Sequence, residues 1–219
     1  GGHTDHSSAE QGHYPVIIHT DRITVNAKVG YLFPQKRYTS LGSQWGFTKH
    51  DQTAELGNKY YKGDQTSFYG NWLFQSIISD SRHQYVTGLS FRSDQYDEEF
   101  FPYTFSMKEV VPGAFFEYTY LPDENFTLVA GARADNHNIY GWLFNPRLHL
   151  RYVPFDQTVL RASIGKGMRT PLPVAENLGL LASSRQWIFP GSGTNAGLPY
   201  GGLMMEKAWN MGASLTKEF

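Results

Sequence analysis

One stretch of nine residues decides the fold: Phe144-Asn145-Pro146-Arg147-Leu148-His149-Leu150-Arg151-Tyr152. Every second residue is apolar, and the residues between them are polar or charged. Helical spacing would mix the two sets around the helix axis, whereas a β-strand places them on opposite faces. The stretch therefore predicts a strand with one apolar face and one polar face.

The same alternation recurs along the chain and predicts nine strands in all. The clear examples are residues 23–33, 126–135, 160–168 and 209–219, and the weaker ones are residues 40–49, 66–79, 83–94 and 108–120. Lys166 interrupts the apolar face of its segment. A tilted strand of ~9–11 residues crosses a bilayer, and most of these segments are long enough to do so.

The connections between the predicted strands alternate between short and long. Short turns are expected near residues 34–36, 79–82, 121–124 and 153–156, and longer connections at residues 50–65, 95–107, 136–143 and 169–205. Outer-membrane β-barrels sort their connections in this way, with tight periplasmic turns and longer extracellular loops. The pattern predicts an all-β fold, an antiparallel transmembrane β-barrel segment, with residues 1–20 and 169–205 as external loops.

The strand count predicts that this barrel is incomplete. A chain that begins outside and ends at the periplasmic face crosses an odd number of times, whereas bacterial single-chain barrels use even numbers of strands. An open sheet would also leave two unpaired strand edges in lipid. The first residues form no targeting segment, so we expect either processing or a start inside a larger gene product.

Composition narrows the class of protein. Aromatic residues make up 16% of the chain and charged residues 18%, and Tyr and Trp favour the interface between a bilayer and water. The net charge of -1, without a basic run, argues against nucleic-acid binding. The lack of cysteine excludes disulfides and thiolate metal sites. No apolar run approaches the ~20 residues of a membrane-spanning helix.

Five short motifs occur in order along the chain: SFYGN at 67–71, VPGAFFEY at 111–118, NPRLHLRY at 145–152, GKGMRTP at 165–171 with AEN at 175–177, and EKAWN at 206–210. From about residue 64 onward, the sequence resembles the barrel of TonB-dependent outer-membrane receptors, particularly the type common in Bacteroidetes. The third and fourth motifs form the most specific pair. The resemblance implies a barrel of about 22 strands, filled by an N-terminal plug domain and coupled to the TonB complex.

The sequence departs from that family because it holds neither a plug domain nor a TonB-box segment. We therefore expect residues 1–219 to be part of the barrel and assign TonB coupling to the parent receptor. The implied function is uptake of a scarce nutrient, such as a siderophore, cobalamin, a metal or a glycan, at the bacterial outer membrane. The implied partners are outer-membrane lipid, the plug domain, the TonB complex and a small nutrient ligand, and no cofactor is expected.

Charged residues on the polar strand faces are the first candidates for ligand binding. A charge on the lipid face near the midplane costs roughly 2–4 kcal/mol, so the polar sets are expected to face the lumen. The candidate lumen residues are Arg133, Asp135, Arg147, His149, Arg151, Arg161 and Arg169. So many arginines need anions, which are either an anionic cargo or, alternatively, plug carboxylates, water and Asp135.

Aromatic residues of the long connection are a second set of candidates. Trp187, Phe189 and Tyr200 lie in the Gly-rich segment 169–205. Such side chains stack on sugars or flat ligands, or they pack on neighbouring loops and close the barrel mouth. The sequence leaves both readings open.

Two clusters raise the question of metal binding. His3, His6 and His13 are weak candidates, together with His19 and with His137 from another predicted loop, because a metal site needs three or four converging ligands and their spacing does not enforce convergence. The acidic cluster formed by Asp94, Asp97, Glu98 and Glu99 is expected at the base of a loop, where it binds a cation or is simply solvated.

Two other classes of protein remain as alternatives. A soluble aromatic-rich β-sandwich would bind glycans through its aromatic residues. A barrel enzyme would need a nucleophile with a base, and Ser163 beside His149 on neighbouring strands is the only pairing of that kind. The sequence has no G-x-S-x-G, P-loop or H-E-x-x-H motif, so no enzyme activity is expected.

Overall fold

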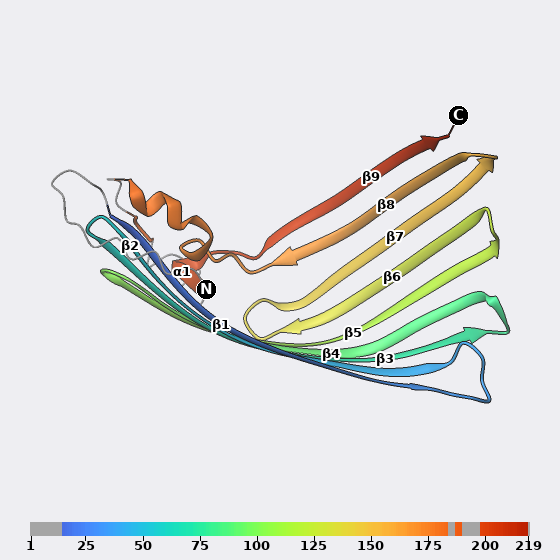
Figure 1. The fold of residues 1–219 in the computed structure, drawn as a ribbon, viewed down its shortest axis with the longest axis horizontal. Coiled ribbons are helices and arrows are strands. Elements are labelled where there is room, and N and C mark those ends of the chain that lie inside the picture. The colour runs from blue at the N-terminus through green and yellow to red at the C-terminus, as the bar shows by residue number, and fades with distance from the viewer. Residues whose placement is uncertain (1–14, 184–186, 190–197, 219) are drawn as a thin grey trace.

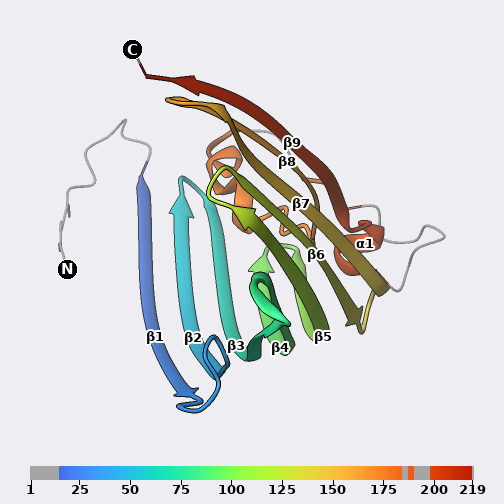
Figure 2. The same cartoon turned by 90° about the vertical axis from the view of Figure 1, so that its right-hand side faces the viewer.

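The computed structural model describes residues 15–183, 187–189 and 198–218. They form one antiparallel sheet whose strand order is the sequence order (Figures 1 and 2). The strands are β1 (Val16–Leu32), β2 (Ser40–Leu56), β3 (Lys59–Ile78), β4 (Asp80–Phe100), β5 (Tyr103–Asp123), β6 (Phe126–His137), β7 (Gly141–Phe155), β8 (Thr158–Arg169) and β9 (Glu206–Lys217). The connection between β8 and β9 contains the 3-10 helix η1 (Ala175–Ala182) and the short helix α1 (Pro199–Gly202). The prediction of nine antiparallel strands is confirmed.

The strand register keeps the two sets of residues on separate faces. Leu148 lies opposite Ala130 and Ile164, whereas Arg147 lies opposite Gly131 and Gly165. Directly opposed residues share a face of the sheet, so apolar side chains line up with apolar ones across β6, β7 and β8. Through the register, Arg147 shares a face with Phe100 of β4, which packs in one cluster with Leu181 of η1. Because η1 and α1 lie on the concave side of the sheet (Figure 1), this is the concave face.

The convex face carries an apolar band bounded by aromatic rows. Near one edge, ring contacts run from strand to strand, with centroids 6.1 Å apart for Phe74 and Tyr85 and 6.3 Å apart for Phe126 and Tyr152. Near the other edge, the rings of Trp45, Phe68 and Phe91 follow one another across β2, β3 and β4. Aromatic rows that flank an apolar band are typical of strands that cross a bilayer.

Strands β2 to β5 continue far beyond the second aromatic row. From Phe91, β4 runs on to Phe100, a length of about 30 Å at 3.3 Å per residue. The convex face of this extension is charged rather than apolar, with Lys49 3.2 Å from Asp51 and Lys62 3.1 Å from Asp64. We call these parts of β2–β5, with their tips and the 170–205 connection, the projecting end, and the opposite edge of the sheet the turn end.

The hydrophobic core of the described residues lies on the concave face of the projecting end. Its fully or nearly fully buried members are Ala54, Leu56, Tyr61, Phe100, Val174, Leu181 and Tyr200. Three of these residues come from the 170–205 connection, which folds back over β2, β3 and β5 (Figure 2). No helix in the described part of the chain has the length and apolar character needed to span a membrane.

The predicted lengths of three connections are wrong. Residues 50–65 and 95–107 are mostly strand, and the turns occupy only residues 57–58 and 101–102. Residues 136–143 shorten in the same way to a turn at 138–140. The physical reason is that the strands continue into a region where the convex face is polar, so the alternation of apolar residues on that face ends before the strands do. The end-to-end asymmetry persists as projecting hairpins instead of irregular loops.

Two further placements differ from the sequence prediction. The acidic cluster lies within β4 and not at a loop base, with Asp94 and Glu98 buried on the concave face and Asp97 and Glu99 on the convex one. β1 already begins at Val16, so residues 16–20 belong to a strand rather than a loop. Residues 1–14, including His3, His6 and His13, lie outside the described residues.

Candidate functional site

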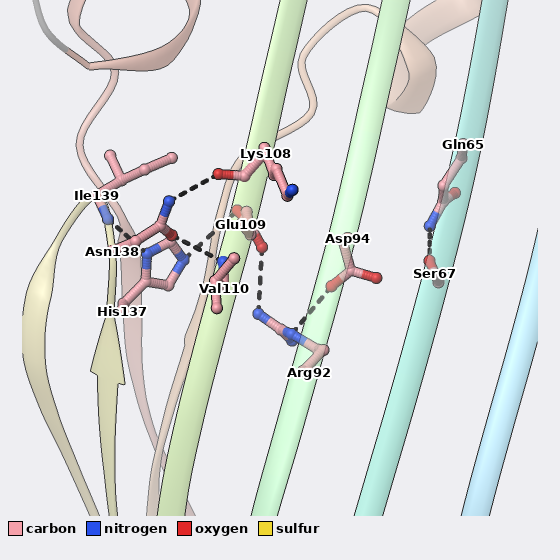
Figure 3. A network of polar contacts seen from close by, with 10 residues as sticks. All are labelled: Gln65, Ser67, Arg92, Asp94, Lys108, Glu109, Val110, His137, Asn138 and Ile139. Atoms are coloured by element: carbon pink, nitrogen blue, oxygen red, sulfur yellow. Dashed lines mark hydrogen bonds and ion pairs between the residues drawn. The ribbon is translucent and has the colours of Figure 1, made fainter.

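The concave face of β4, β5 and β6 carries a buried ionic network (Figure 3). The Arg92 guanidinium lies 3.0 Å from the Asp94 carboxylate and 3.2 Å from that of Glu109. Both carboxylates are almost fully buried, at 5% and 2% exposure. A buried carboxylate needs a counter-charge or hydrogen bonds, so Arg92 is the residue that allows two acids to lie side by side.

His137 closes this network from the end of β6. Its Nδ1 accepts a hydrogen bond from the backbone N–H of Ile139 at 3.1 Å, so Nε2 carries the proton, and it faces Glu109 at 3.5 Å. The next residue, Asn138, bonds the backbone of Val110 and Lys108, each at 2.8 Å (Figure 3). His137 is therefore buried and fixes the turn, rather than lying at an open loop tip. The described residues contain no group of three potential metal ligands.

Arg133 and Asp135 form a second ion pair on the same face of β6, four and two residues before His137. The Arg133 Nε lies 2.8 Å from an Asp135 oxygen, and its Nη2 donates to the Ser90 hydroxyl at 2.9 Å. Gly113 makes this possible, because a β-carbon there would lie 1.9 Å from the Asp135 carboxylate. Asp135 thus supplies the anion for Arg133 within the barrel wall.

The carboxylate that pairs with Arg147 lies two strands away. Glu117 of β5 and Arg147 of β7 stand in one row with Gly131 of β6 between them. The two side chains form an ion pair over the glycine. Sequence reasoning missed Glu117, because its partner becomes visible only when the register of three strands is known. Gly131 is a neighbour of neither residue along the chain, so no local sequence signal points to this pair.

Arg169 has two carboxylate partners at the root of the long connection. It bonds Glu206 of β9 at 2.6 Å and Glu176 of η1 at 2.9 and 3.0 Å. Neither glutamate was among the sequence-predicted residues. This arrangement fixes the start of the connection to both strands that flank it.

His149, Arg151 and Arg161 lie together near the turn end of the concave face. They line a hollow of about 460 Å³ with Ser163, Ser214 and Gly212 among its other walls. Ser163 stands directly opposite His149 in the register. The described residues show no hydrogen bond between the two, so the arrangement lacks the contact that an activated nucleophile needs.

The predicted aromatic residues lie at the projecting end. Tyr200 is buried, and its hydroxyl donates to Glu98, as does the Tyr61 hydroxyl at 2.8 Å. Burial, reinforced by the hydrogen bond to Glu98, raises the pKa of Tyr200. Trp187 packs edge-on against Phe100 with ring centroids 6.1 Å apart. The packing interpretation therefore holds for Tyr200, whose ring is not available for stacking on a ligand.

Trp187 also borders open space. With Tyr60, Phe101 and Tyr103 it lines a hollow of about 580 Å³ between the tips of the two projecting hairpins. The Phe101 side chain is 91% exposed there. The role of Trp187 in this aromatic hollow as a ligand contact remains a prediction.

Comparison with known proteins decides the family. The family model described as TonB dependent receptor-like, beta-barrel matches residues 5–217. The chain belongs to this family. TonB-dependent receptor barrels lie in the outer membrane and act as transporters, not enzymes, so the Ser163–His149 hypothesis is set aside. No curated protein matches the chain.

Two solved structures show how this TonB-dependent receptor barrel relates to others. The alcaligin outer-membrane receptor FauA of Bordetella pertussis has a TM-score of 0.59 at 14% identity, and the match covers 71% of this chain and 30% of that one. The siderophore receptor PirA of Acinetobacter baumannii has a TM-score of 0.58 at 11% identity, with 71% and 26% covered. The chain thus spans less than a third of either receptor. The special likeness to Bacteroidetes receptors remains a prediction.

The family assigns the two faces of this TonB-dependent receptor barrel segment. The convex band faces lipid, and the concave network faces the lumen. The soluble β-sandwich is wrong, because the described residues form one sheet and the apolar side chains of the band are not covered by a second one. Leu148, for example, remains 41% exposed.

Proposed function

We propose that the chain forms part of the barrel wall of a receptor that takes up a scarce nutrient by TonB-coupled transport. The observation that carries the proposal is the sorting of the two faces. The convex face has an apolar band with aromatic rows, and the concave face at the same level holds the ion pairs of Arg133 and Arg147. An apolar exterior and a polar interior are what a wall between lipid and a wet lumen requires.

A siderophore is the cargo that we favour over cobalamin, a free metal ion or a glycan. One similar structure is described as an alcaligin receptor and the other as a siderophore receptor. The concave wall also carries six arginines on β4–β8, two of which, Arg151 and Arg161, have no carboxylate partner among the described residues. Guanidinium groups bind oxyanions more strongly than they bind neutral hydroxyls. The six are Arg92, Arg133, Arg147, Arg151, Arg161 and Arg169.

Further strands and a plug domain complete the receptor in this proposal. β1 and β9 each pair with a neighbour on one side only within the described residues. A strand edge with free N–H and C=O groups is unfavourable in lipid, so more strands flank both. The projecting end is the external end in this proposal, because β2–β5 extend there beyond the apolar band and outer-membrane barrels carry their longer extensions on the extracellular side. The plug domain fills the lumen and couples the receptor to the TonB complex.

The test is uptake by cells that express the complete receptor. Deletion of the receptor is expected to abolish growth on one iron–siderophore chelate from a panel supplied as sole iron source. The same loss is expected when the receptor is intact and TonB is absent. Unchanged growth on every chelate would overturn the siderophore assignment, and the same strains tested with cobalamin and with glycans then decide whether nutrient uptake itself is wrong.

A further inference from the structure

Six arginines line the concave face of β4–β8, and two of them differ from the rest. Arg92, Arg133, Arg147 and Arg169 each have a carboxylate partner in the wall. Arg151 has only the backbone carbonyl of Glu124, at 3.0 Å. Arg161 makes no hydrogen bond or ion pair within residues 15–183, 187–189 and 198–218. The described part of the wall therefore supplies carboxylates for four arginines and none for the other two.

The two exceptional arginines are neighbours. Arg151 and Arg161 stand directly opposite each other in the β7–β8 register, on the same face. Directly opposed like charges destabilise an antiparallel pair of strands. The nearby turn acid Asp123 bonds the backbone N–H groups of Asn125 and Phe126 instead. The two guanidinium groups therefore lie side by side, and no carboxylate of the described residues balances their charge.

The surroundings of the pair are built to accept an anion. Both arginines line the hollow of about 460 Å³, and hydroxyl groups of Thr127, Ser163 and Ser214 line it as well. Thr127 and Ser214 extend the row of the arginines on either side. Gly212 lies opposite Ser163, where a β-carbon would approach the serine hydroxyl to 3.4 Å. The glycine keeps the floor of the hollow open.

We propose that this arginine hollow binds a carboxylate- or phosphate-type oxyanion. Guanidinium forks bind such groups through paired N–H donors, and hydroxyls on both sides add donors for the remaining lone pairs. The volume lies within the range of small-molecule sites. The oxyanion comes from one of two sources, a free solute in the lumen or an acidic side chain of a polypeptide inside the barrel. The inference uses the proposed function only to identify the concave face as the lumen.

The experiment uses the purified complete receptor in detergent, with thermal unfolding as the readout. Arg161→Gln and the double variant Arg151→Gln/Arg161→Gln are compared with Arg147→Gln, which removes the same charge from an arginine that already has its carboxylate. Each protein is unfolded in inorganic phosphate and in sodium chloride of equal ionic strength. A free-solute source predicts that phosphate raises the wild-type unfolding temperature in a saturable way. The double variant is expected to need about tenfold more phosphate for the same rise, and Arg147→Gln no more than wild type.

A polypeptide source predicts a different pattern. The double variant then unfolds at a lower temperature than wild type without phosphate, phosphate adds nothing to wild type, and Arg161→Lys restores part of the loss because the positive charge remains. The proposal is overturned if phosphate has no specific effect and the Arg161 variants unfold at the wild-type temperature or above it. That result is expected when no anion binds, because the substitution then stabilises the protein by removing one of two charges that repel each other. None of these readouts depends on uptake, so the result is separate from that for the proposed function.

Discussion

Within strands β2–β5, the apolar side chains lie on the convex face in the band and on the concave face in the projecting end. In the band, Phe68 and Phe91 point to the convex side. In the projecting end, Tyr61 and Phe100 of the same two strands point to the concave side and are buried there. The register of β3 with β4 runs without a shift from Tyr61 to Ile77, so no bulge turns one set of side chains into the other.

The difference shows that the surroundings, and not strand geometry, decide which face is apolar. The convex face of the band faces lipid, and its concave face borders the polar interior of the barrel. Beyond the band, water reaches the convex face, and the 170–205 connection covers the concave one. A single continuous strand therefore changes its pattern where the bilayer ends.

Cysteine labelling gives the largest expected difference between the two ends of the sheet, because each position should be either labelled or unlabelled. The chain has no cysteine, so Phe101→Cys at the projecting end and Asp156→Cys at the turn end are unique labels within it. A membrane-impermeant maleimide added to intact cells is expected to label the first and not the second. Asp156→Cys should react only after the outer membrane is permeabilised. Labelling of Asp156→Cys alone would invert the proposed orientation.

Arginine substitutions on the convex face of β4 should measure where the band ends. Leu89 lies inside the band and is 61% exposed on its surface. Leu89→Arg is expected to lower the free energy of unfolding of the lipid-embedded receptor by about 2–4 kcal/mol, because the charge enters hydrocarbon. Gln95→Arg, further along the same face, should change it by less than about 0.5 kcal/mol. Equal effects at both positions would mean that the band has been placed wrongly.

The Glu98 contacts test the concave core of the projecting end. Tyr200→Phe removes one of the two hydroxyls that hold this buried carboxylate. The expected loss is about 1–3 kcal/mol in the free energy that docks the connection, since a buried acceptor loses its donor. Hydrogen exchange of residues 170–183 should become faster. Unchanged exchange would show that the apolar contacts alone keep the connection in place.

The same contact predicts a response to alkaline pH. Burial raises the pKa of Tyr200 above that of an unfolded tyrosine, so the folded state keeps a proton that the unfolded state loses. Its contribution to stability is present below the ordinary tyrosine pKa of about 10 and is lost as the pH rises above that value. Hydrogen exchange of residues 170–183, measured across this range, should accelerate less steeply with pH in Tyr200→Phe than in wild type.

The smallest effect is expected on the charged convex face of the projecting end. Lys49 and Asp51 form an ion pair whose members remain half exposed. Exposed pairs of this kind contribute little to stability, so Lys49→Gln should leave the unfolding temperature unchanged at low and at high salt. A clear loss at low salt would mean that this face is covered by a partner.

The sequence predicted the strands well and their ends poorly. Alternation identified all nine strands because a bilayer segment needs apolar residues at every second position, as in Phe144 to Tyr152. It failed for residues 50–56 and 95–100, where the convex face is polar and only the concave face mixes polar and apolar residues. Asp135 was found as an anion for Arg133 because the two are close in sequence. Glu117 was not, since its approach to Arg147 depends on the alignment of three strands. The burial of Tyr200 depends on a contact between segments far apart in the chain.

The 170–205 connection has a consequence for the shape of the wall. Its ends are anchored at β8 and β9, and Arg169 fixes its first residues there. Between these ends, η1 packs on β2 and β3, and α1 packs on β5. These contacts link the C-terminal part of the sheet to β2, β3 and β5, which the strand pairing joins to β8 and β9 only through the strands between them. Loss of the contacts is therefore expected to change the curvature of the sheet without breaking any strand pair.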